Sequence, residues 1–168
     1  LSSGASVVYM WKVVVFNGNK YWIIGTSPID LYKRYKEGVL QKEVQVDKVK
    51  ETIQDIQKEA DKLQKQGINK IILLSHLGYT LDKIVANQTQ GIDVILGGHS
   101  HDLLLDVKEG ENLFYSKTGE PVVITQAGRD GIYFGILNLE FSSDGIIKTV
   151  QNNIGYTKDF NRNAPVKY

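Results

Sequence analysis

The stretch from Lys70 to Leu103 constrains the fold of this chain most strongly. It covers most of two runs rich in valine, isoleucine and leucine, Ile68–Ser75 and Ile92–Leu96. Such runs are typical of strands that are buried on both faces of a parallel sheet. Between them, Thr80–Asn87 has the apolar spacing of a short helix, with Thr80 as a candidate N-cap. Strand, helix and strand together predict a βαβ unit and an α/β fold.

All three histidines of the chain follow these two runs. His76 comes directly after the first run, and His99 and His101 come after the glycine pair that ends the second. Ligands of open α/β sheets bind at the carboxyl ends of the strands, so we expect these side chains to meet there. If the second turn is extended, His99 and His101 point to one face with Cα atoms about 6.5 Å apart.

Convergent neutral imidazoles are typical of a metal site. Any one of these histidines is explained as well by backbone hydrogen bonds, but the placement of all three favours metal binding. We therefore predict His76, His99 and His101 as metal ligands. One zinc ion held by all three, with an open position for water, is one form of such a site, although the sequence supplies no evident general base for it.

Composition limits the class of protein. A chain of 168 residues is expected to form one domain, and its net charge of +1 gives no reason to expect a nucleic-acid or anionic-membrane partner. The absence of cysteine excludes disulfides and zinc thiolate sites. No apolar run approaches the length of a membrane span. Because the chain starts at Leu1 without the features of a signal peptide, we expect a processed, excised or expressed fragment.

Two further segments have clear patterns. Asn17-Gly18 between β-prone runs predicts an antiparallel hairpin of Trp11–Phe16 with Lys20–Ile24. Val46–Gln66 carries an apolar stripe with a 3.6-residue period, which predicts a helix packed on the sheet rather than a coiled coil. The remaining expectations are a short helix or a loop over Ile29–Gln45, a surface loop over Asp106–Glu120, strands at Pro121–Gln126, Ile132–Phe141 and Ile146–Asn152, and an irregular tail after Gly155.

The two histidine motifs resemble a known family. GIDVILGGHSH at 91–101, together with IILLSHLGYTLD at 71–82, resembles the 5′-nucleotidase group of calcineurin-like metallophosphoesterases. The hairpin sequence at 11–30 and PVVITQAGRDGIYFGILNLEF at 121–141 resemble neighbouring parts of the same family, so the resemblance covers about Trp11 to Phe141. Within the last stretch, Gln126 either borders the active site or simply ends a strand.

The resemblance implies a site for two divalent ions, such as zinc, manganese or iron. His76 and His99 would bind one ion and His101 its neighbour, each with a partner on its other ring nitrogen. The family's pattern begins earlier, with Asp-x-His, Gly-Asp and Gly-Asn-His-Glu motifs that supply the remaining ligands and the histidine acting on the phosphate. None of these motifs occurs in this sequence, which therefore has no catalytic residue by this comparison.

This absence has a consequence for charge. Two divalent ions bring four positive charges together, and three neutral imidazoles offset none of them. Asp93 is expected to start a strand or accept a backbone hydrogen bond, and Asp102 to be a solvated loop residue. We therefore expect the chain alone to bind metal weakly, at one site if any, and to have little or no phosphatase activity.

The implied architecture is a four-layer αββα sandwich with a mixed sheet, flanking helices and β-hairpins. Residues 1–168 would form the C-terminal half of the catalytic domain, with a core over about 7–152 and a tail over 153–168. An exposed sheet edge would receive the missing N-terminal half or a homodimer partner. The implied substrate is a nucleotide or another phosphoester, and the implied location is extracytoplasmic. The alternative is a non-catalytic metal-binding or interaction module on the same fold.

Overall fold

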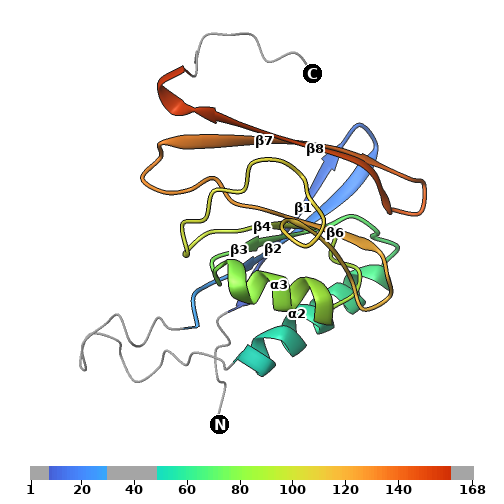
Figure 1. The fold of residues 1–168 in the computed structure, drawn as a ribbon. Helices are drawn as coiled ribbons and strands as arrows, with labels where there is room; N and C mark the ends of the chain where they lie inside the picture. Colours follow the sequence, from blue (N-terminus) through green and yellow to red (C-terminus); the bar gives the residue numbers. More distant parts are fainter. Residues whose placement is uncertain (1–7, 30–48, 160–168) are drawn as a thin grey trace.

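The computed structural model describes residues 8–29 and 49–159 (Figure 1). The expectation of a helix or loop over Ile29–Gln45 falls outside these ranges except for its first residue. The elements, in chain order, are β1 (Val8–Phe16), β2 (Asn19–Thr26), α2 (Val49–Gln64), β3 (Ile71–Ser75), α3 (Tyr79–Gln88), β4 (Val94–Leu96), β5 (Leu113–Tyr115), β6 (Pro121–Thr125), β7 (Tyr133–Phe141), β8 (Ile147–Tyr156) and a 3-10 turn (Thr157–Asp159).

Six of the strands form one mixed sheet in the order β1-β2-β3-β4-β6-β5. The inner strands β2, β3, β4 and β6 run parallel, whereas β1 and β5 pair antiparallel at the two edges. β7 and β8 form a separate antiparallel sheet. Helices α2 and α3 lie on one side of the larger sheet and the β7–β8 pair lies on the other (Figure 1). This arrangement confirms the predicted α/β fold class.

Helix α2 packs on the sheet through the predicted apolar stripe. Ile56, Ala60 and Leu63 are completely buried and belong to the core between the helices and the sheet. The helix begins at Val49 and ends near Gly67, whose φ of 76° is the left-handed conformation typical of a helix C-terminus. A second, smaller core lies between the sheet and β7–β8, where Val94, Val123 and Ile147 are buried.

The predicted hairpin at Asn17-Gly18 is confirmed. Phe16 pairs with Asn19, and the two turn residues have φ values of 48° and 75°. Positive φ at both positions is the requirement of a tight type I′ turn, which asparagine followed by glycine satisfies best. The hairpin therefore places β2, and with it Trp22 and Ile24, in the core beside β3.

Two segments differ from expectation. Asp106–Glu120 is not entirely a loop, because β5 forms within it and pairs with β6. The strand has only three residues among polar ones, so local sequence does not distinguish it. β8 continues beyond Asn152 to Tyr156, since β7 offers it a partner along its whole length, and the ring of Phe134 lies over Gly155. The segment expected as a tail from residue 153 therefore starts as strand.

Neither of the described helices has the combination of length and apolar character that crossing a bilayer requires.

Truncating a buried residue of α2 should destabilise the fold. We expect Leu63→Ala to lower the free energy of unfolding by about 2–5 kcal/mol, because the side chain is fully buried and leaves a cavity. Lys58→Ala on the exposed face of the same helix is the control and should change it by less than about 0.5 kcal/mol. Urea denaturation followed by circular dichroism measures both, and equal effects would contradict the assigned packing face.

Candidate functional site

The histidine motifs leave the sheet side by side. β3 and β4 are paired in parallel, with Leu74 opposite Leu96, so the turns that follow them start at the same edge. Each strand carries core residues on its helix-facing side, and their burial fixes the position along the sheet at which each strand ends. His76 and His99 consequently occupy the carboxyl-end edge, as expected for a ligand site in an open α/β sheet.

The structure brings the rings of His76 and His99 together. Their centroids are 5.3 Å apart and the ring planes make an angle of 74°, so one ring meets the other edge-on. His76 is exposed and His99 is half-buried, which leaves the pair open to solvent on one side. Two imidazoles in such contact can supply two ligands to one metal ion with limited adjustment.

Each of these rings lies against a glycine of the other turn. A Cβ atom added to Gly98 would lie 3.1 Å from Nδ1 of His76, and one added to Gly78 would lie 3.4 Å from Cδ2 of His99. Gly78 also has a φ of 95°, which side-chain-bearing residues rarely adopt. The glycines therefore make room for the opposite histidine, in addition to letting the chain turn.

His101 is placed differently. The backbone of this turn is not extended, because His99 and His101 have φ values of 74° and 64°, both in the left-handed region. The expectation that their side chains share one face as in a strand does not apply to this backbone. His101 is exposed. Across 8–29 and 49–159, no three histidine, cysteine, aspartate or glutamate side chains lie close enough to hold one ion.

The donor set therefore fits part of a metal site. His76 and His99 suit one ion, but within the described ranges neither His101 nor a carboxylate joins them as a third donor. A divalent ion held by two neutral imidazoles keeps its full charge, which a complete protein site usually offsets with carboxylates. These residues by themselves provide two imidazole donors for one ion.

Two polar residues around the histidines were not recognised from the sequence. The Oγ of Ser100 accepts a hydrogen bond from the backbone N–H of Tyr79 at 2.9 Å. It thereby caps α3, which begins at Tyr79 and not at Thr80, and Thr80 is not the N-cap. This contact joins residues 21 positions apart, so no local capping signal could have revealed it.

Asp82 is the second unrecognised residue. It is completely buried at the start of α3, and its Oδ1 accepts a hydrogen bond of 2.5 Å from Ser75 Oγ, directly before His76. Its Oδ2 has no hydrogen-bond partner among the described residues and faces Gly97, where an added Cβ would lie 2.7 Å away. Burial raises the pKa of Asp82 to about 6, against the lowering effect of the Ser75 hydrogen bond.

Asp93 has a role in the sheet, as expected. Its Oδ2 accepts a hydrogen bond of 2.7 Å from the backbone N–H of Ile71, which ties the start of β3 to the start of β4. Burial is the largest cause that raises the pKa of Asp93 to about 7, and nearby Glu120 adds to the increase. The carboxyl lies at the opposite ends of these strands from the histidines and cannot reach them.

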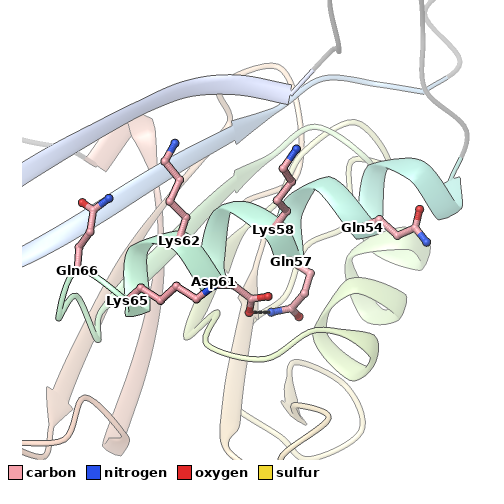
Figure 2. Close-up of a pocket in the computed structure, with 7 residues that line it drawn as sticks. All are labelled: Gln54, Gln57, Lys58, Asp61, Lys62, Lys65 and Gln66. Atoms are coloured by element: carbon pink, nitrogen blue, oxygen red, sulfur yellow. Dashed lines mark hydrogen bonds between the residues drawn. The ribbon is translucent and has the colours of Figure 1, made fainter.

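A surface groove on α2 is a separate feature (Figure 2). It is lined by glutamine, lysine and aspartate side chains, and none of the three histidines is among them. Gln57 donates a hydrogen bond of 2.6 Å to Asp61 and accepts one of 2.8 Å from the backbone N–H of Gln90, so it fastens α2 to the end of α3. These two hydrogen bonds give Gln57 a structural role in joining the helices.

Comparison of the sequence with known proteins finds 5′-nucleotidases among its relatives. A venom 5′-nucleotidase of Gloydius brevicauda is 30% identical over 176 aligned residues, which cover 99% of this chain and 29% of that protein. The 5′-nucleotidase of Bos taurus is 37% identical over 107 residues, which cover 58% of this chain and 19% of that protein. No family model matches the chain.

Comparison of the structure agrees. A 5′-nucleotidase precursor from Thermus thermophilus superposes with a TM-score of 0.75 at 29% identity, covering 87% of this chain and 29% of that one. The NAD nucleotidase of Haemophilus influenzae gives a TM-score of 0.70 at 29% identity, covering 83% and 26%. The predicted resemblance is confirmed, and the chain spans less than a third of the length of each of these relatives.

Buried Asp82 and half-buried Asp93 should make stability depend on pH. Each has a folded pKa above the ordinary value of 3.8, so the folded state binds protons more tightly than the unfolded state. Their contribution is therefore greatest at low pH and is lost as the pH rises through about 6 for Asp82 and about 7 for Asp93.

Asp93→Asn isolates one of these contributions. The amide keeps an acceptor for the Ile71 N–H but does not ionise. The variant should therefore gain on the native chain as the pH rises from about 4 to about 7, by roughly 3 kcal/mol in free energy of unfolding. Urea denaturation across this range, with exposed Asp144→Asn as control, measures the gain. A difference that does not vary with pH would contradict the buried, proton-binding Asp93.

Proposed function

Because the chain is a relative of the 5′-nucleotidase group of metallophosphoesterases, we propose that it is the C-terminal half of the catalytic domain of a metal-dependent phosphohydrolase acting on nucleotides. The observation that carries this proposal is the His76–His99 pair at the ends of β3 and β4. The pair is formed by the two motifs on which the resemblance rests. Similarity to a 5′-nucleotidase and to an NAD nucleotidase supports nucleotides as the class of substrate.

The histidines would divide between two ions. His76 and His99 would hold one ion, and His101, on the solvent-exposed part of the same turn, would hold its neighbour. Divalent ions in such sites activate water and stabilise the charge that develops on a transferring phosphoryl group. The residues of this chain would orient the ions, since the glycine contacts fix how His76 and His99 approach one another. Zinc, manganese and iron all accept imidazole ligands.

The carboxylates of the complete site would come from another segment. Asp82 and Asp93 serve the fold through their hydrogen bonds to Ser75 and Ile71. The relatives are more than three times as long as the part that this chain matches, which leaves ample length for the missing ligands. The 168-residue chain is therefore proposed to be inactive alone and to bind at most one ion weakly.

Exposed apolar side chains on the larger sheet mark the surface that would receive this segment. Leu74 is in the middle of the larger sheet, on the face away from the helices, and it is 54% exposed. At the sheet edge, and at the end of the sheet away from the histidines, the β1 residues Val15 and Phe16 are 63% and 50% exposed. Exposed apolar side chains on a central strand and an edge strand are typical of an interface whose partner is missing. The proposed occupant is the N-terminal half of the same domain, and a homodimer is the competing outcome.

The proposed location is extracytoplasmic. Venom enzymes are secreted products, and the relatives in venom align with nearly the whole of this chain. The sequence also lacks cysteine, so its fold would not depend on the redox state of the compartment.

Metal titration tests the assignment of the histidines. Isothermal titration of the chain with Zn²⁺ should give at most one ion per chain, and His76→Ala and His99→Ala should each weaken binding by about tenfold or more. His101→Ala is the matched control and should leave this first ion unaffected, because His101 does not join the pair. An equal loss in all three variants would contradict the proposed division and favour one three-histidine site.

Phosphohydrolase activity should require the missing N-terminal half of the domain. The chain alone, supplied with Zn²⁺ or Mn²⁺, should hydrolyse AMP no faster than His99→Ala. Coexpression with a polypeptide encoded upstream of Leu1 should restore hydrolysis, and Leu74→Asp should reduce that restoration by placing a charge in the interface. Phosphate release measures both.

Reading the coding sequence upstream of Leu1 provides a simpler check. Asp-x-His and Gly-Asn-His-Glu motifs there would support the enzyme. AMP hydrolysis by the chain alone at an ordinary enzyme rate, about 1 s⁻¹ or faster, would contradict the proposal.

A further inference from the structure

The turn that carries His99 and His101 has an unfavourable backbone. Both residues have positive φ, at 74° and 64°, a region in which the backbone of a residue with a side chain is strained. Two such residues separated by one position keep this conformation only if surrounding groups hold it. The placement of both imidazoles therefore depends on the groups that hold this turn.

Gln126 reaches this turn from the neighbouring strand. It directly follows β6, whose Thr125 pairs with Leu96 at the end of β4, and it is buried, with 3% of its surface exposed. Its backbone carbonyl accepts a hydrogen bond from Leu104 N–H at 3.0 Å, beyond the turn. The side chain is therefore directed under the turn from a fixed position in the sheet.

The carboxamide of Gln126 contacts the turn before, between and after the two histidines. Nε2 donates a hydrogen bond to the carbonyl of Gly98 at 3.1 Å. Oε1 accepts hydrogen bonds from Ser100 Oγ at 3.3 Å and from the backbone N–H of Asp102 at 2.5 Å. One side chain thus satisfies three polar groups of the same turn.

These contacts connect both histidine motifs. Ser100 Oγ, which donates to Gln126, also accepts from the N–H of Tyr79, three residues after His76. A hydroxyl can make these two hydrogen bonds at once, as donor in one and acceptor in the other. Gln126 therefore acts on the turn of His99 directly and on the turn of His76 through Ser100.

We propose that Gln126 is a positioning residue, whose carboxamide holds the left-handed turn so that His99 faces His76 while His101 remains on the other part of the turn. It acts through the histidines and does not bind metal itself. The role rests on the proposed metal site and requires an amide in particular. Gly98 offers an acceptor and Asp102 a donor, and only a group with both a donor and an acceptor satisfies the two.

Two variants of nearly equal size test this role. Gln126→Met removes all three side-chain hydrogen bonds, and Gln126→Glu keeps the acceptor but loses the donor to Gly98. Asn112→Leu is the matched control. Asn112 is also a buried amide that clasps a loop, accepting from Lys108 N–H at 2.6 Å and donating to the carbonyl of Asp106 at 2.8 Å.

Nuclear Overhauser effects in the metal-free chain report the conformation. Residues with positive φ have their amide proton unusually close to their own Hα, so His99 and His101 should each give a strong intraresidue signal, with a further signal between the rings of His76 and His99. We expect both Gln126 variants to weaken these signals and to raise the Zn²⁺ dissociation constant about 10–100-fold. The Asn112→Leu chain should retain the signals and the native dissociation constant.

Three results would overturn the role. They are retention of the signals in both Gln126 variants, their equal loss in Asn112→Leu, and their loss with an unchanged Zn²⁺ dissociation constant. If Gln126→Met does not fold, the comparison of Gln126→Glu with Asn112→Leu still decides. A native chain that binds no Zn²⁺ would contradict the assignment of His76 and His99 as a sufficient pair of ligands, while the Overhauser signals would still decide whether Gln126 holds the turn.

Discussion

The parallel pairing of β3 with β4 is the constraint on which the histidine site depends. It places two chain segments, 20 or more positions apart in sequence, at one edge of the sheet with a fixed offset. Most apolar side chains of both strands pack against the helices or against β7–β8, so neither strand can slip without exposing core residues. The relative placement of His76 and His99 therefore depends on the buried sheet and not on the turns alone.

Much of this arrangement follows from the sequence, because it depends on residue periodicity. The apolar runs before His76 and His99 predict buried strands, and parallel strands end at a common edge, so the meeting of these two side chains could be expected. The hairpin at Asn17-Gly18 and the buried stripe of α2 are predictable for similar local reasons. Such features need no knowledge of which distant residues meet.

Features that depend on long-range contacts could not be predicted. The hydrogen-bond acceptor for the first N–H of α3 comes from Ser100, in another turn, and the positive φ values of His99 and His101 depend on Gln126 from another strand. A short polar-flanked strand such as β5 forms only because β6 offers it an edge. Asp82 illustrates the same limit, since its burial and its hydrogen bond from Ser75 depend on how α3 packs beside β3.

The left-handed conformation of His99 and His101 also affects which amino-acid replacements this turn can accept during evolution. Glycine and asparagine adopt such backbones more readily than histidine does, so replacing either histidine by one of them would relieve strain. Fold stability therefore favours glycine or asparagine at these positions, whereas the proposed metal binding requires histidine. A lineage freed from the need for metal would be expected to lose these histidines early, because their loss would make the protein more stable and not less.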